Sequence, residues 1–212
     1  MKLLTETYPD YINQIPKEGR HIIAQQTDDE IIVYQAYNTA IAHFAVENQF
    51  FGGSHYSYGR MSWLKPNFLW MMYRCGWAAK ENQESVLAIW IKKTDFNAIL
   101  KEAVFSSYKS EQYTSQEEWK NELANKEVRL QWDPDHDPHG NKQERKAIQL
   151  GLKGKILKRF GTEMIIRIED ITDFVKTQKS ILKEKGIENL VVPKEWVYQT
   201  GDEEIDRIIG LK

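Results

Sequence analysis

Residues 55–80 carry the side chains best suited to bind a nucleotide. No acidic residue lies among the 33 residues between Glu47 and Glu81, although the whole chain has a formal net charge of −2. Cations and aromatic rings alternate through this stretch: Arg60, Lys65, Arg74 and Lys80, with Tyr56, Tyr58, Trp63, Phe68, Trp70, Tyr73 and Trp77. Arginine and lysine bind phosphate, and aromatic rings stack on nucleobases. The segment therefore indicates either a nucleotide site or an aromatic core whose cations reach its rim.

Glu144 is a carboxylate that could act on such a ligand. It follows a loop containing two prolines, and Arg145 and Lys146 come directly after it. Neighbouring positive charges keep a carboxylate ionised, and an ionised carboxylate stabilises positive charge that develops in a transition state. The alternative is a glutamate in the first turn of a helix, where the helix dipole favours an acidic residue.

The loop WDPDHDPHGNKQE has some of the spacing of a calcium site. Asp133, Asp135, Asp137 and Glu144 take positions one, three, five and twelve of an EF-hand-like loop. Position six is Pro138 instead of glycine, and the preceding EVRLQW is typical of a strand where an EF-hand needs a helix. We therefore favour a proline-stiffened surface loop and expect no metal, with a calcium-stabilised structural protein as a further alternative.

Composition and missing motifs exclude several classes of protein. Hydrophobic residues make up 41% and charged residues 28%, which is typical of a globular protein and not of a disordered chain. The P-loop, Rossmann, hydrolase-elbow and zincin motifs are absent from the sequence. No apolar run is long enough for a signal peptide or membrane span, and Cys75, the single cysteine, is expected to be a buried thiol. These features predict a cytoplasmic protein with no membrane partner.

The elements that position these residues alternate without strict βαβ order, which predicts an α+β fold. We expect a central sheet that is mixed or mainly antiparallel, flanked by helices, in a single domain spanning residues 1–212. The expected strands include a hairpin of residues 19–26 and 30–37, then residues 56–63, 85–93, 127–132 and 164–170. The expected helices begin at Asn38, Pro66, Asp95, Ser115 and Asp173. Asp95 is expected to cap the third of these helices, and Ser115 and Glu118 to form a capping box at the start of the fourth. Gly76 and Gly186 are expected to end two of them.

Several motifs together resemble a known family. They are RHIIAQ, VYQAYNTAIA, RMSWLKPNFLWMMYRCGWA, QESVLAIWI, VRLQWDPDHDP and ERKAIQLGL. Over most of its length the chain is similar to a widespread bacterial and fungal family that is classified as a domain of unknown function. This resemblance implies no activity.

A second resemblance is to the ADP-ribosyltransferase fold, a split sheet that binds NAD without a Rossmann motif. One branch of that superfamily uses an arginine on the first strand, a serine opening a later strand-to-helix segment, and a glutamate farther along the chain. Arg20, Ser62 and Glu144 occur here in that order. The resemblance implies that Arg20 holds the diphosphate or a ribose, that Ser62 supports the ribose, and that Glu144 stabilises the oxocarbenium-like transition state. It further implies a pocket lined by Tyr37, Arg60, Trp63, Lys65 and Arg74.

The leading hypothesis is therefore an enzyme of ADP-ribosyltransferase type. Its substrate would be NAD, and its acceptor a protein or a nucleic acid. The alternative is a non-catalytic nucleic-acid-binding module in which the cations of residues 55–80 contact phosphates, so that affinity falls steeply with salt.

Overall fold

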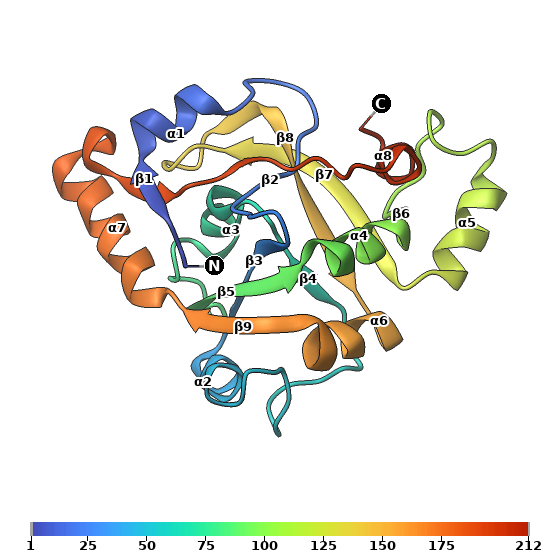
Figure 1. The fold of residues 1–212 in the computed structure, drawn as a ribbon, viewed down its shortest axis with the longest axis horizontal. Helices are drawn as coiled ribbons and strands as arrows, with labels where there is room; N and C mark the ends of the chain where they lie inside the picture. Colours follow the sequence, from blue (N-terminus) through green and yellow to red (C-terminus); the bar gives the residue numbers. More distant parts are fainter. Residues whose placement is uncertain (1, 212) are drawn as a thin grey trace.

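Two sheets form the centre of the protein in the computed structural model, which describes residues 2–211 (Figure 1). One has the strand order β3-β5-β9 and the other the order β4-β8-β7-β6. Their strands are β3 (Glu30–Tyr37), β4 (Ser62–Leu64), β5 (Ser85–Lys92), β6 (Ala103–Phe105), β7 (Val128–His136), β8 (Lys142–Leu152) and β9 (Ile165–Asp170). Neighbouring strands are antiparallel except for the parallel pair of β6 and β7. The expected α+β fold with mainly antiparallel sheets is confirmed.

The two sheets are joined where β3 meets the end of β4. Tyr34 and Lys65 exchange both backbone hydrogen bonds there, with N–O distances of 2.7 and 3.1 Å. This contact places the outer edge of the four-stranded sheet beside the three-stranded one.

Helices surround the sheets, and the C-terminal segment ties distant parts together. The helices are α1 (Tyr8–Gln14), α2 (Thr39–Asn48), α3 (Phe68–Cys75), α4 (Lys93–Lys101), α5 (Gln116–Asn125), α6 (Gly154–Arg159), α7 (Thr172–Lys185) and α8 (Glu203–Ile209). After α7 the chain crosses the molecule to α8 (Figure 1), and on the way β10 (Val191–Pro193) pairs with β1 (Thr5–Thr7) and β11 (Trp196–Val197) with β2 (Ile23–Ala24).

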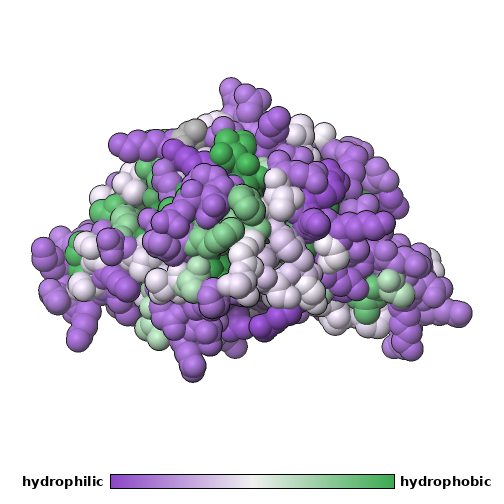
Figure 2. Space-filling view, turned by 90° about the horizontal axis from the view of Figure 1, so that it is seen from below, coloured by the Kyte–Doolittle hydropathy of each residue, from purple (hydrophilic) through white to green (hydrophobic). Residues whose placement is uncertain are grey.

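Strand β5 is buried on both faces, which explains its uninterrupted run of apolar residues. Leu87, Ile89 and Ile91 belong to one core cluster, and Val86 and Trp90 belong to a second cluster on the other side of the sheet. On the face shown in Figure 2, polar residues cover most of the surface and apolar residues form small patches.

The caps predicted at Asn38 and Ser115 and the helix end predicted at Gly76 are confirmed. Asn38 accepts a hydrogen bond from the backbone N–H of Ile41 at 3.0 Å, and Ser115 accepts one from Glu118 at 3.1 Å. Gly76 ends α3 in the left-handed conformation with φ 61°. These contacts span a few residues, so the sequence alone predicts them.

Several predicted boundaries are wrong. The predicted hairpin of residues 19–26 and 30–37 forms only near its turn, where Gln26 pairs with Ile31 and Ile32 N donates to the carbonyl of Gln25 at 2.9 Å. Farther from the turn, β2 pairs with β11. Of the expected strand 56–63 only Ser62 and Trp63 belong to a strand, because β4 begins at Ser62 and continues to Leu64. Helix α3 begins after an Asn67 cap, not at Pro66. Helix α4 begins at Lys93, so Asp95 lies in its first turn and does not cap it. The predicted loop after EVRLQW shrinks to a short turn, because β7 continues to His136.

Candidate functional site

Three adjoining hollows lie along the four-stranded sheet, and together we call them the trough. The first has a volume of about 440 Å³, the second 350 Å³ and the third 490 Å³. Gln83 lines both the first and the second hollow, and Gln131 lines both the second and the third. The shared residues show that neighbouring hollows adjoin one another.

Strand alternation creates the second hollow. Side chains of successive strand residues point to opposite faces, so Leu64 enters the core while Trp63 and Lys65 line the hollow. In the register of β8 with β7, Gln149 lies opposite Gln131, and both side chains line the same hollow. The sheet thus presents a polar face here and an apolar face to the core.

Helix α3 supplies Arg74 to the mouth of the second hollow. The helix begins where it does because Asn67 Oδ1 accepts a hydrogen bond from Trp70 N at 2.7 Å and Glu195 Oε1 accepts one from Phe68 N at 2.9 Å. Arg74 lies in the last turn of this helix and is exposed. Its guanidinium therefore adds positive charge where the hollow opens to solvent.

Lys65 is the most unusual residue of the trough. Only 3% of it is exposed, and its Nζ makes no hydrogen bond or ion pair with the described residues. Burial, and to a smaller extent the positive charge of Arg74, lowers the pKa of Lys65 to about 7. Its Nζ is not one of the enclosed unpaired side-chain atoms. A largely buried lysine that lines a hollow and has no protein partner there is equipped to meet an anionic ligand.

Three polar side chains on β7 and β8, near Lys65, are joined by hydrogen bonds. Gln149 Nε2 donates to Asp133 Oδ2 at 2.8 Å and to Gln131 Oε1 at 2.7 Å. Asp133 lines the third hollow, and it is the only carboxylate among the described residues that line the trough. Its position is therefore fixed by Gln149 and it faces a site otherwise rich in cations.

The first hollow contains a hydroxyl cluster centred on Ser62. Gln35 Nε2 donates to Ser62 Oγ at 2.9 Å, and the hydroxyl oxygens of Tyr37 and Ser62 are 2.5 Å apart. Burial raises the pKa of Tyr37 well above its usual value, so the phenol stays neutral. Such a cluster can bind the hydroxyl groups of a sugar.

The residues predicted to bind the ligand are distributed over all three hollows. Tyr37, Arg60 and Ser62 line the first, Trp63, Lys65 and Arg74 line the second, and Arg20 lines the third. Arg20 also donates to the carbonyl of Gly210 at 2.8 Å and lies over the ring of Phe105, so part of its guanidinium is already engaged.

Arg20, Ser62 and Glu144 do not meet in one cavity, so the expected convergence is wrong. Ser62 pairs with Leu152 at one end of β8, whereas Glu144 lies near the other end and is exposed. The separation of positions 144 and 152 is eight residues, or roughly 26 Å at about 3.3 Å per residue. Glu144 lines none of the three hollows. The pairing register, which joins residues distant in sequence, determines this separation.

Gln131 and Gln149 are not among the predicted site residues, and Asp133 is predicted only as a position of the calcium-like loop, but all three line the trough. They stand at alternate positions of two strands, between apolar neighbours such as Leu130 and Leu150. That period-two pattern marks one polar sheet face and was available in the sequence.

Most of the other aromatic residues of the basic segment belong to the core. Phe68, Trp70 and Trp77 are buried. Cys75 is also buried, as expected, and burial raises the pKa of its thiol. The nucleotide interpretation therefore depends on Trp63, Tyr37 and Tyr56, which do line the trough.

The aspartate loop does not form an EF-hand site. It is a turn between two strands, and Asp135 Oδ2 accepts hydrogen bonds from Arg145 at 2.6 and 2.8 Å in the interior. Within residues 2–211 no three His, Cys, Asp or Glu side chains are grouped so that they could hold a metal ion.

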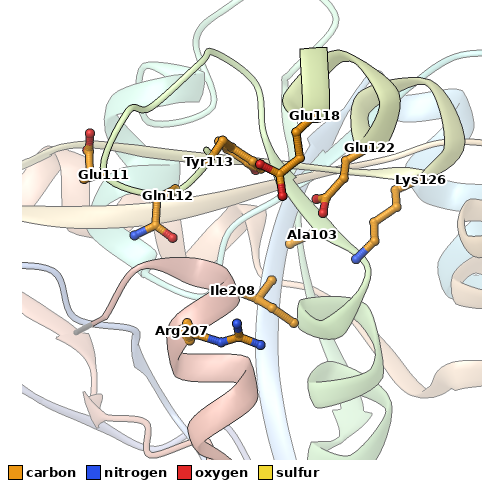
Figure 3. Close-up of a pocket in the computed structure, with 9 residues that line it drawn as sticks. All are labelled: Ala103, Glu111, Gln112, Tyr113, Glu118, Glu122, Lys126, Arg207 and Ile208. Atoms are coloured by element: carbon orange, nitrogen blue, oxygen red, sulfur yellow. The ribbon is translucent and has the colours of Figure 1, made fainter. Parts of the chain in front are cut away.

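A separate hollow of about 370 Å³ lies between α5 and α8 (Figure 3). Glu111, Glu118 and Glu122 contribute three carboxylates to it, against the cations of Lys126 and Arg207. Carboxylates repel phosphate, and Glu118 already accepts a hydrogen bond from Thr114 N at 2.7 Å at the start of α5. This acidic hollow is therefore a poorer nucleotide site than the trough.

The family comparison agrees with the first resemblance. A family model described as "Domain of unknown function (DUF4291)" matches residues 21–198. No curated protein matches the chain. Among the described residues, no helix combines the length and the apolar character needed to cross a membrane.

Proposed function

The chain belongs to the DUF4291 family, and we propose that it binds NAD in the trough and transfers ADP-ribose to a protein or nucleic-acid acceptor. The observation that supports this function is the composition of the trough. Cations, aromatic rings and sugar-binding hydroxyls line three adjoining hollows that contain one carboxylate. The two sheets joined at one edge are also compatible with the split sheet of an ADP-ribosyltransferase.

Each part of NAD has a matching chemistry in the trough. Trp63 offers a partly exposed ring for stacking, and Lys65 and Arg74 offer positive charge for the diphosphate. Ser62 and Tyr37 offer hydroxyls for a ribose. We propose that the dinucleotide extends through adjoining hollows, because its two nucleotides need two stacking or hydrogen-bonding regions.

Asp133 replaces Glu144 as the carboxylate proposed for the reaction. In ADP-ribosyl transfer the glycosidic C–N bond breaks and its electron pair leaves with neutral nicotinamide. The ribose carbon becomes positively charged until a lone pair of the acceptor forms the new bond and the acceptor loses a proton. A fixed carboxylate stabilises that positive charge, and Asp133 is held by Gln149 for this purpose.

Labelled NAD tests the function and separates the two carboxylates. We expect Asp133→Asn to lower ADP-ribosyl transfer about 100-fold, a typical loss for one electrostatic contact, while NAD affinity measured by calorimetry changes little. The matched control is Glu144→Gln, which should transfer at the wild-type rate. Absence of saturable NAD binding, or loss of transfer in Glu144→Gln and not in Asp133→Asn, would contradict the proposal.

The same calorimetry distinguishes the nucleic-acid module. Strong binding of a short single strand that weakens steeply with salt, without NAD binding, would assign the cations of the trough to a nucleic acid instead.

A further inference from the structure

We infer that Lys65 and Arg74 form an anion subsite for a phosphate-type group in the second hollow. The identification of the anion as a diphosphate rests on the proposed function. The subsite itself rests on the geometry of the second hollow and is tested without NAD.

The position of Lys65 is the first argument. Its backbone is held by both hydrogen bonds to Tyr34, and its side chain lines the second hollow with only 3% of the residue exposed. The backbone of Lys65 is thus held in place, and its side chain lines a hollow without a hydrogen bond to a protein acceptor. Buried lysines normally have an anionic partner, so an anion from outside completes this site.

The surrounding charges are the second argument. Arg74 and Cys75 face Lys65 from α3, Asp133 faces it from β7, and Tyr34 packs from β3. Cys75 is a buried thiol, and Asp133 is engaged by Gln149. Arg74 is therefore the fixed positive charge of the hollow, and it attracts an anion while disfavouring the ammonium form of Lys65.

Anion binding favours the ammonium form of Lys65 over the uncharged amine. Burial lowers the pKa of Lys65 to about 7, so above neutral pH the free protein holds mainly the uncharged amine. A doubly charged anion next to Nζ favours the ammonium form, and binding then takes up a proton from solvent. Affinity should consequently fall by up to about tenfold per pH unit above pH 7, and level off below it.

Inorganic sulfate is the probe, because its charge stays constant between pH 6 and pH 9. Sulfate titrations followed by NMR at several pH values should show the predicted fall in affinity above pH 7. Calorimetry in two buffers of different ionisation enthalpy should show proton uptake. Lys65→Met should bind sulfate at least tenfold more weakly at pH 6 and with no pH dependence over this range.

Two further variants complete the test. Lys65→Arg keeps its charge at every pH used, so it should bind sulfate without pH dependence or proton uptake. Lys158→Met changes an exposed lysine on α6 and should behave as wild type. Circular dichroism confirms that each variant is folded.

Wild-type binding that is independent of pH, or equal binding by Lys65→Met, would overturn the inference. Sulfate binding with proton uptake in a protein that fails to bind NAD would preserve the subsite and reject the NAD function. NAD turnover without any contribution of Lys65 to sulfate binding would support the NAD function and reject the subsite.

Discussion

Two buried cationic residues differ in whether the protein provides a partner for their charge. Arg145 is 2% exposed and forms an ion pair with Asp135 while also donating to the carbonyl of Pro16 at 2.7 Å. Lys65 is equally buried and has no such partner. A satisfied buried pair positions the β7–β8 turn against the N-terminal segment. A largely buried lysine without a protein partner costs folding free energy, and we attribute its presence to ligand binding.

The cost of burying Lys65 predicts a pH-dependent gain in stability for Lys65→Met. A folded-state pKa of about 7 against the ordinary 10.5 makes the ammonium form roughly 5 kcal/mol less favourable in the folded protein. Below about pH 7 both the folded and unfolded states carry the proton, so the full penalty is present. Between about pH 7 and pH 10.5 the folded protein loses the proton and the penalty shrinks.

Lys65→Met should therefore raise the free energy of unfolding more at pH 6 than at pH 9. Urea denaturation at the two pH values measures the difference, with Lys158→Met as the exposed control. An equal effect of Lys65→Met at both pH values would show that Lys65 titrates normally in the folded protein.

At the scale of elements, the close packing of β4 on β8 holds Trp63 at the trough. Trp63 pairs with Gly151, and a Cβ added to Gly151 would lie 2.9 Å from the Trp63 ring and 2.7 Å from Met61 Sδ. Glycine at position 151 thus leaves room for the indole to lie flat over the neighbouring strand.

Gly151→Ala should displace Trp63 and weaken NAD binding by about tenfold, with a stability loss of about 1–3 kcal/mol from overpacking. Calorimetry with NAD and thermal melting measure the two effects. Gly59→Ala is a suitable control, because its added Cβ would lie 3.5 Å from the nearest atom, Ser57 Oγ. Unchanged NAD affinity in a folded Gly151→Ala variant would remove Trp63 from the site.

Packing of two core clusters and strand pairing by the C-terminal segment hold the whole molecule together. Two core clusters lie on either side of β5, and the C-terminal segment pairs through β10 and β11 with β1 and β2. No metal-binding group of three side chains occurs in the part of the chain that the structure describes.

Removing metal ions should therefore leave stability unchanged. A chelator such as EDTA is expected to shift the melting temperature by less than about 1 °C, whereas saturating NAD should raise it, because a ligand stabilises only the state that binds it. A large decrease with EDTA, restored by calcium, would support the calcium alternative and contradict this prediction.

Local features of this protein were determined by the sequence itself. The caps at Asn38 and Ser115, the end of α3 at Gly76 and the buried strand SVLAIWI depend on residues within a few positions of each other, so short patterns encode them. The basic aromatic segment likewise predicts Trp63, Lys65 and Arg74, which line the second hollow.

Strand pairing determines which residues distant in sequence lie together. The register of β4 on β8 sets Ser62 far from Glu144, and the register of β7 on β8 brings Asp133 to Gln149. Strand pairing acts between segments many residues apart, and a shift of one position exchanges the faces of a strand. The pairing therefore makes Asp133, and not Glu144, the carboxylate of the candidate site.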